Sequence, residues 1–138
     1  MSQKRAMTKS LVIFTDGASR GNPGPAAIGA IVKDETGNNI ASISQAIGHT
    51  TNNQAEYLAI IAALERAINL GASQVEVRSN SELVTRQLNG QYRVKKASLR
   101  PLYLKVKQLQ GQLQGLTITC IPRQQNREAD RLANLALD

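Results

Sequence analysis

The chain has 138 residues and a formal net charge of +7, from 17 Lys and Arg against 10 Asp and Glu. This length fits one domain with its own hydrophobic core and excludes a second domain of ordinary size. One cysteine excludes an internal disulfide, and no segment is long and apolar enough for a membrane span or a signal peptide, so we expect a cytoplasmic protein that binds no membrane.

The first part of the chain predicts three antiparallel strands. Leu11–Thr15 is a short apolar run, which favours a buried strand that ends at Asp16. Residues 17–25 contain three glycines and two prolines and are expected to form a loop. Ala26–Lys33 and Ile40–Ile47 then resume strand patterns on either side of a turn, so consecutive hairpins are expected.

After Gly48 the apolar residues recur at three- and four-residue spacing, which predicts a long helix from the N-cap candidates Thr51–Asn53 to Gly71. The remaining pattern predicts a strand at 75–78, helices at 80–88 and 101–113, a strand at 116–121 and a last helix at 126–137. Strands that are reached through helical crossovers are parallel. The fold class is therefore α/β, with a five-stranded mixed sheet of three antiparallel strands followed by two parallel ones, flanked by helices.

Two reactive residue types occur once each. Cys120 lies in the apolar run 116–121, where a buried thiol that packs as a small hydrophobe is expected. His49 lies outside every candidate site and is expected to be a surface residue. Neither is predicted to be a nucleophile or a metal ligand.

Basic residues are concentrated in the second half of the chain. No acidic residue occurs from Leu83 to Arg127, whereas nine basic residues do. A generically basic surface is one interpretation of this stretch. A polyanionic partner is the favoured one, and phosphate contacts would make binding weaken as salt rises.

Four polar side chains stand where the local pattern calls for an apolar residue or for none. Asp16 ends a strand, where it could also cap a turn. Glu56 begins the long helix in line with core residues, although an acid there can simply favour the helix dipole. Asp130 lies on the last helix as a possible solvated acid, and Asn80 follows a strand as a possible N-cap.

These four positions are also expected to meet. Asp16 and Asn80 follow strands whose carboxyl ends point to the same edge of the sheet, where ligands bind in open α/β folds. Glu56 and Asp130 can reach that edge from helix starts. Crowded carboxylates repel one another unless a cation is bound, and ligands that are all oxygen favour Mg²⁺ or Mn²⁺ over zinc.

The residues around these positions resemble type 1 ribonuclease H over residues 11–137. The resemblance is carried by four runs in the family's order, Phe14–Pro25, Thr50–Glu56, Ser79–Val84 and Asn126–Ala133. It implies a ribonuclease H-like domain over residues 9–138, preceded by a disordered segment at 1–8. It also implies endonucleolytic hydrolysis of the RNA strand of an RNA–DNA hybrid, which leaves 3′-hydroxyl and 5′-phosphate ends.

By this resemblance two Mg²⁺ or Mn²⁺ ions would clamp the scissile phosphate. Asp16 would bridge the ions, Glu56 and position 80 would hold one of them, and Asp130 the other. The same resemblance implies substrate contacts by residues that follow the first strand or begin the long helix, together with two further positions: Gly17, Ser19, Asn22, Asn52 and Gln54 along the RNA minor groove, Thr51 and Asn53 at a DNA phosphate, and Ser81 and Arg123.

The chain departs from the family pattern at three places. The family has an aspartate at position 80, and Asn80 here stands between the matching Ser79 and Ser81. An amide supplies no negative charge to hold a divalent ion, so we expect this chain to bind hybrid and to cut it very poorly. The exchange suits a deliberate substitution made to trap uncut hybrid, and it is also compatible with a natural loss.

The other two departures concern loops. Many relatives have a histidine before the last helix, where this chain has Arg123-Gln124-Gln125, and the basic, tryptophan-rich protrusion of bacterial members is reduced to residues 90–99. Two functional alternatives stay open. One is a non-catalytic nucleic-acid-binding module, and the other is an integrase-like phosphoryl-transfer domain on the same architecture. In each case we expect the protein to be a monomer.

Overall fold

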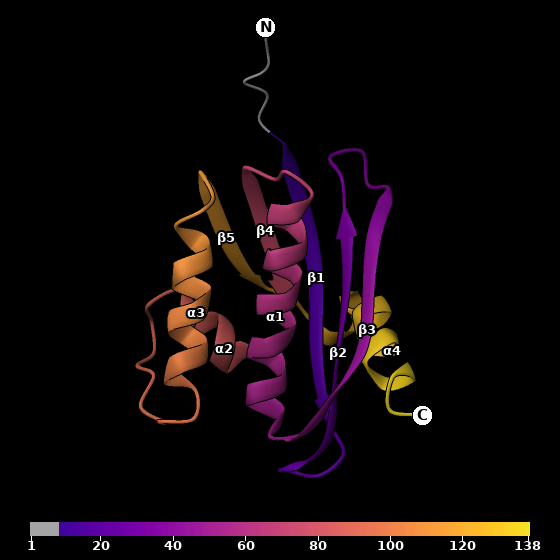
Figure 1. The fold of residues 1–138 in the computed structure, drawn as a ribbon, viewed down its shortest axis with the longest axis vertical. Coiled ribbons are helices and arrows are strands. Elements are labelled where there is room, and N and C mark those ends of the chain that lie inside the picture. The colour runs from indigo at the N-terminus through magenta and orange to yellow at the C-terminus, as the bar shows by residue number, and fades with distance from the viewer. Residues whose placement is uncertain (1–8) are drawn as a thin grey trace, which may run out of the picture.

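The computed structural model describes residues 9–138, and the predicted disordered segment 1–8 lies outside the described residues. A 5-stranded sheet with helices on both faces makes up this part of the chain (Figure 1). The elements are β1 (Ser10–Ser19), β2 (Gly24–Lys33), β3 (Asn39–Thr50), α1 (Asn52–Asn69), β4 (Gln74–Ser79), α2 (Glu82–Leu88), α3 (Arg100–Gln110), β5 (Gly115–Cys120), the 3₁₀ turn η1 (Arg123–Gln125) and α4 (Arg127–Leu135).

The sheet has the strand order β3-β2-β1-β4-β5. β1 pairs antiparallel with β2, and β2 pairs antiparallel with β3, because tight turns connect them. β4 pairs parallel with β1, and β5 pairs parallel with β4, because each is reached through helices. This arrangement confirms the predicted mixed sheet of three antiparallel strands followed by two parallel ones.

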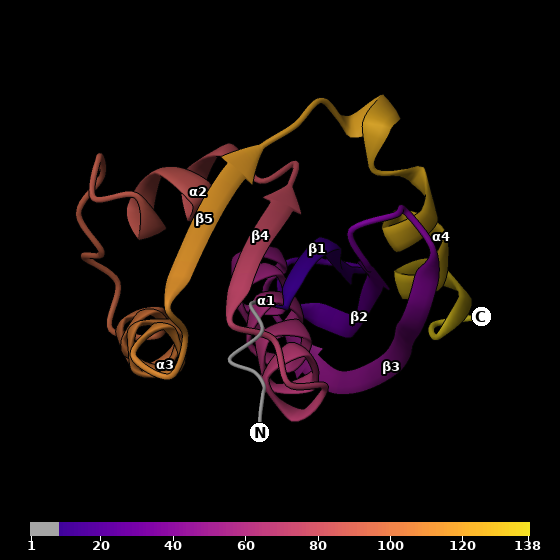
Figure 2. The same ribbon diagram turned by 90° about the horizontal axis from the view of Figure 1, so that it is seen from above.

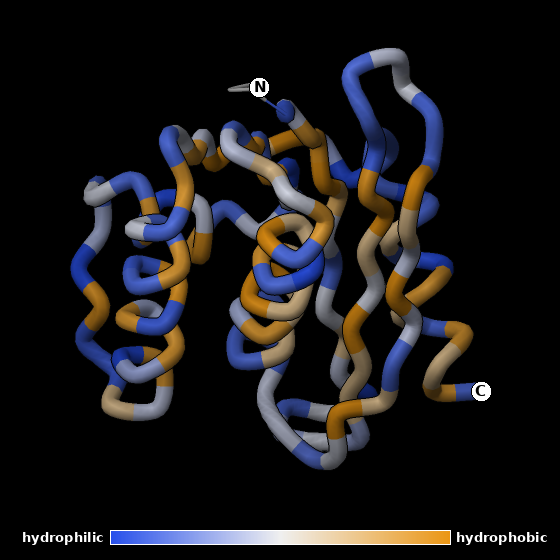
Figure 3. The backbone as a smooth tube through the Cα atoms, turned by 45° about the horizontal axis from the view of Figure 1, so that its top comes forward, coloured by the Kyte–Doolittle hydropathy of each residue, from blue (hydrophilic) through white to orange (hydrophobic). Residues whose placement is uncertain are grey.

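The hydrophobic core lies between the sheet and α1. Side chains from the central strands, such as Ile13 and Val77, are fully buried against Ile60 and Leu64 of α1. Hydrophobic and hydrophilic residues alternate around α1 and α3, as expected for helices that bury one side (Figure 3). No helix within residues 9–138 is both long and apolar enough to span a membrane.

The two faces of the sheet are covered differently (Figure 2). α1 and α3 lie on one face, whereas α4 crosses the opposite face over β1, β2 and β3. α4 approaches closely because β2 has a glycine beneath it. A Cβ atom on Gly29 would lie 2.2 Å from the carbonyl oxygen of Ala129, so only glycine fits there.

Three local predictions were wrong. β1 does not end at Asp16, because Gly17, Ala18 and Ser19 continue the ladder with β2, and the expected loop is shorter. α2 is capped by Ser81, whose side chain accepts from the Val84 N–H, and not by Asn80. Cys120 is exposed, because it is the last residue of β5, which is an edge strand of the sheet. His49 is exposed, as predicted.

Candidate active site

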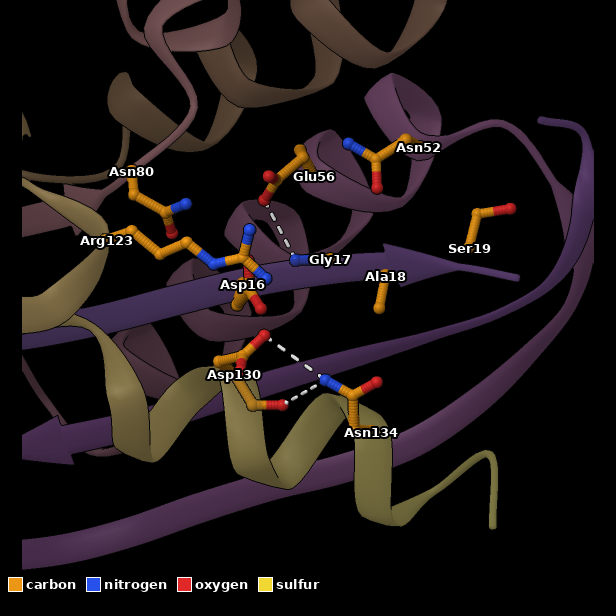
Figure 4. Close-up of a pocket in the computed structure, with 10 residues that line it drawn as sticks. All are labelled: Asp16, Gly17, Ala18, Ser19, Asn52, Glu56, Asn80, Arg123, Asp130 and Asn134. Atoms are coloured by element: carbon orange, nitrogen blue, oxygen red, sulfur yellow. Dashed lines mark hydrogen bonds between the residues drawn. The ribbon is translucent and has the colours of Figure 1, made fainter. Parts of the chain in front are cut away.

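One pocket contains all four polar positions that the sequence singled out (Figure 4). Asp16 comes from β1, Glu56 from the first turns of α1, Asn80 from the residue after β4, and Asp130 from α4. The pocket is lined by Asp16, Gly17, Ala18, Ser19, Asn52, Glu56, Asn80, Arg123, Asp130 and Asn134. Segments that are far apart in the sequence thus contribute to one polar cavity.

The strand register explains why Asp16 and Asn80 are neighbours. Thr15 and Ser79 form the last parallel pair of β1 with β4, so each polar residue directly follows a paired position. Asp16 also pairs with Gly29 of β2, and a side chain at position 29 would point toward α4. Side chains at directly paired positions point to the same face of the sheet, so Asp16 faces α4 as well. Its carboxyl group therefore lies between the end of β4 and the helix that carries Asp130.

Glu56 reaches the same pocket from the other face of the sheet. Its Oε1 accepts a hydrogen bond from the Gly17 N–H at 2.8 Å, which ties α1 to β1. α1 can come this close because Gly17 has no side chain, since a Cβ atom there would lie 2.3 Å from the Ala55 carbonyl carbon. The Glu56 side chain is buried as a result, with 5% of the residue exposed.

Burial and neighbouring carboxyl groups raise the pKa values of Asp16 and Glu56. Burial, the charge of Glu56 and the nearby Asp130 carboxyl raise the pKa of Asp16 to about 8, against a smaller lowering by Arg123. Burial raises the pKa of Glu56 to about 7, with Asp130 adding to the effect and the Gly17 hydrogen bond opposing it. The pocket therefore holds more negative charge than its surroundings stabilise.

The pocket's donor chemistry fits a hard divalent cation, because the carboxylates of Asp16, Glu56 and Asp130 offer only oxygen. As the side chains stand, no group of three or more His, Cys, Asp and Glu residues within residues 9–138 is arranged to hold a metal ion. The three carboxylates line the pocket without forming a complete ligand set, and the fourth position carries an amide.

The residues predicted to contact substrate divide into two sets. Gly17, Ser19, Asn52 and Arg123 line the pocket together with the carboxylates. Asn22 lies beside it, and its Oδ1 accepts from the Asn52 N–H at 3.0 Å.

The other predicted substrate residues do not line the pocket, and three of them cap helices. Thr51 and Gln54 form a capping box at the start of α1, in which each side chain bonds the other's backbone. Ser81 caps α2. Asn53 lies in the first turn of α1 and is half-buried. The sequence pattern correctly predicted a helix start at Thr51–Asn53, whereas it began the next helix at Asn80 and not after Ser81.

Sequence reasoning missed Ala18, Asn134 and Asn126. Asn134 lines the pocket and donates from Nδ2 to the Asp130 backbone oxygen at 2.9 Å and to its Oδ1 at 3.2 Å. Its position one turn after Asp130 on α4 was the available signal. Asn126 is buried behind the pocket, and no local pattern indicated its contacts.

A second hollow adjoins the pocket, and we call it the arginine hollow. It is lined by Arg123, Gln124, Arg127, Asp130 and Arg131, and it shares Arg123 and Asp130 with the pocket. Among residues 9–138, none of its three arginines makes an ion pair within 4.0 Å. A positive surface thus lies next to the carboxylates.

Comparison with known proteins shows relatives over most of the chain. Residues 14–136 match the family described as "Reverse transcriptase-like". Ribonuclease HI of Halobacterium salinarum is 45% identical over 125 residues, which cover 91% of this chain and 63% of that protein. A bifunctional protein of Mycobacterium tuberculosis is 44% identical over 129 residues, which cover 93% of this chain and 35% of that protein. The chain thus spans between about a third and two thirds of these relatives.

Solved structures agree with the sequence matches. LC11-RNase H1, solved in complex with an RNA/DNA hybrid, has 45% identity and a TM-score of 0.89, with 93% of this chain and 96% of that chain covered. The family match, the identity to named ribonucleases H and the shared fold lead to one conclusion: this chain belongs to the ribonuclease H family.

Proposed function

We propose that this chain is an endoribonuclease of RNA–DNA hybrids whose activity is impaired by Asn80. The observation that carries the proposal is the single pocket that joins Asp16, Glu56, position 80 and Asp130. A solved relative with 45% identity and the same fold is complexed with such a hybrid. The products would have 3′-hydroxyl and 5′-phosphate ends.

The carboxylates of the pocket would each have a role in holding metal ions. Asp16 would bridge two divalent ions, Glu56 and a carboxylate at position 80 would hold one, and Asp130 the other. When bound, Mg²⁺ or Mn²⁺ would supply an activated water and stabilise the leaving oxygen of the RNA phosphate. Asp16 and Glu56 suit this role because they are buried and crowded, so a cation removes their repulsion.

Substrate would be recognised around the same pocket. Ser19 and Asn52 line it and offer polar groups toward the RNA minor groove, where the 2′-hydroxyls distinguish RNA from DNA. Arg123 lies between the pocket and the arginine hollow, and it would face a backbone phosphate. A compact, cytoplasmic monomer that acts on hybrid duplexes is consistent with these features.

The deciding experiment is the Asn80→Asp variant, assayed on a labelled RNA–DNA hybrid with Mg²⁺ or Mn²⁺. We expect cleavage to rise by about 100-fold or more over the Asn80 protein, because a charged ligand is restored to a preorganised site. Double-stranded DNA and double-stranded RNA of the same sequence should stay uncut.

Asn69→Asp is the matched control. It makes the same change of charge, and Asn69 is exposed at the end of α1. It should leave cleavage unchanged. If the Asn80→Asp variant binds the hybrid but leaves it uncut under both metals, the enzyme interpretation fails, and a non-catalytic nucleic-acid-binding module takes its place.

A further inference from the structure

The pocket is supported from behind by a side chain that takes no part in lining it. Asn126, between η1 and α4, is 1% exposed. Its Nδ2 donates to the Thr15 carbonyl oxygen at 2.8 Å and to Asn80 Oδ1 at 2.7 Å. One amide group thus connects Thr15 of β1, directly before Asp16, with the residue that follows β4.

The backbone of Asn126 extends the same connection to α4. Its carbonyl oxygen accepts from the Asp130 N–H at 3.1 Å, and its N–H donates to the Arg123 carbonyl oxygen at 2.9 Å. Asn126 therefore contacts Asn80 directly, and it contacts the backbone of Asp130 and of Thr15, the neighbour of Asp16. No other residue in the described chain makes this set of contacts.

The orientation of the two amides follows from a group that can only accept. The Thr15 carbonyl oxygen has no hydrogen to donate, so Asn126 must turn Nδ2 toward it. The second hydrogen of Nδ2 then faces Asn80, which must accept it with Oδ1. The Asn80 nitrogen is left for the pocket, and in Figure 4 this nitrogen is the atom turned toward Glu56.

The same orientation leaves the other polar atom of the Asn126 side chain without a partner in the described chain. Its Oδ1 is buried without a hydrogen-bond partner within residues 9–138, which is unfavourable for a polar atom. An aspartate at 126 would have no hydrogen to donate and would place a charge against two oxygens. A leucine, which has the same branched shape, would lose both hydrogen bonds. The two donated hydrogen bonds are therefore the feature that an asparagine supplies here.

We propose that Asn126 is a positioning residue that sets the orientation of the side chain at position 80. With aspartate at 80, it would hold one carboxylate oxygen and leave the other for the pocket. With Asn80, the atom left for the pocket is an NH₂ donor, so the amide offers the site a group that repels cations. The consequence for catalysis rests on the proposed function, whereas the orientation itself does not.

The first test needs neither metal nor activity. In a ¹⁵N-labelled sample of the protein as it stands, both Nδ2 protons of Asn126 should exchange slowly with water. The Asn80 amide protons should exchange about 100-fold faster or more, because they face the open pocket. In the Asn80→Asp variant the Asn126 amide signals should persist and shift, because a charged oxygen replaces a neutral one as acceptor.

Two results of this test would overturn the proposal. One is an Asn126 side-chain amide that does not respond to Asn80→Asp. The other is an Asn80 amide as well protected as that of Asn126, which would mean that its nitrogen is bonded within the protein. Both results are independent of whether any hybrid is cut, so they are distinguishable from failure of the proposed function.

The second test measures the consequence in the Asn80→Asp background. Adding Asn126→Leu should lower kcat at least about 10-fold while KM for the hybrid stays within about threefold, because Asn126 orients position 80 without touching substrate. The matched control is Gln87→Leu, which also removes a buried amide, one bonded to the Tyr57 hydroxyl and the Arg93 carbonyl oxygen. It should keep kcat within about twofold.

Equal losses of kcat in the two leucine variants would reduce the role of Asn126 to general stability and overturn the proposal. If Asn126→Leu does not fold, the amide spectra of the Asn80 and Asn80→Asp proteins decide the question by themselves.

Discussion

Eight of the ten acidic side chains fall into two groups, and the other two, Asp34 and Glu35, lie in the turn between β2 and β3. Five make surface ion pairs within 4.0 Å, for example Glu82 with Arg86. Asp16, Glu56 and Asp130 make none and line one pocket. Burying carboxyl groups without ion pairs lowers the stability of a folded chain, and such groups are typical of catalytic and binding sites.

The first residue-scale prediction concerns pH. The pKa values of Asp16 and Glu56 are raised in the folded protein to about 8 and about 7, so their protonated forms favour folding. Their contribution is complete below pH 4 and is lost as pH rises toward 8. Each pKa unit corresponds to about 1.4 kcal/mol, so the metal-free protein should lose at least about 3 °C of Tm over this range.

Thermal unfolding at constant ionic strength between pH 4.5 and 8, with a chelator present, checks this expectation. Asp34 and Glu76 have lowered pKa values, so their contributions change only at lower pH and do not obscure the trend. A metal-free Tm that rises between pH 5 and 8 would contradict it.

A second residue-scale prediction compares position 80 in its two forms. The Asn80→Asp variant adds a fourth carboxylate to the pocket, so without metal it should melt at a lower temperature than the Asn80 protein. It should also gain more Tm from added Mg²⁺, because a ligand stabilises the state that binds it more tightly. Differential scanning calorimetry with and without Mg²⁺ measures both effects, and identical curves for the two proteins would show that these side chains do not share a site.

At the scale of elements, the site depends on how closely two helices approach the sheet. Gly17 lies under α1 and Gly29 under α4, and neither position has space for a Cβ atom. The two helices carry Glu56 and Asp130 to opposite sides of Asp16. The positions of the carboxylates therefore follow from the packing of whole helices against small residues.

We accordingly expect Gly29→Ala to lower the free energy of unfolding by about 3 kcal/mol or more, because α4 must move away from β2. In the Asn80→Asp background it should also reduce cleavage, because Asp130 moves with the helix. Urea unfolding measures the first effect. Gly111→Ala is the control, since Gly111 has a φ of −64° at the end of α3 and should tolerate alanine within about 1 kcal/mol.

At the scale of the whole molecule, charge is distributed unevenly. The net charge is +7, and the arginine hollow places three unpaired guanidinium groups of the described chain beside the carboxylate pocket. A cluster of carboxylates next to a positive surface suits a phosphate backbone that is held by arginines and cut at a metal site.

This arrangement predicts how hybrid binding depends on salt. In the Asn80 protein, which we propose binds hybrid and cuts it very poorly, Arg127→Gln and Arg131→Gln should each weaken hybrid affinity. Each should also reduce the slope of log Kd against log salt concentration by about 1, because one phosphate contact is lost. Fluorescence anisotropy with a labelled hybrid across a salt series provides both numbers.

Arg66→Gln provides the comparison for these variants. Arg66 is exposed in the last turn of α1, at the end of the helix away from Glu56. The Arg66→Gln substitution removes the same charge and should leave the slope of log Kd against log salt concentration unchanged. An equal change of slope in all three variants would show that only net charge matters.

The sequence by itself determined the order and type of the elements and the four positions that meet in the pocket. Apolar periodicity identified each strand and helix, and the parallel crossovers brought Asp16 and Asn80 to one edge of the sheet. The elements were predictable because each depends on residues close together in the chain, and the meeting of Asp16 and Asn80 was predictable because helical crossovers make the strands parallel. The sequence misplaced the end of β1 and the burial of Cys120, because both depend on the neighbouring strand or on its absence.

Only the tertiary structure decided how the site is held together. The two hydrogen bonds from the Asn126 side chain join residues 111 and 46 positions apart in the chain. The raised pKa of Asp16 likewise depends on burial and on charges from two other segments. Hydrogen-bond partners and burial are properties of packed surfaces, so no pattern within one segment can specify them. The tertiary structure therefore adds the orientation and the charge state of groups whose positions the sequence had already indicated.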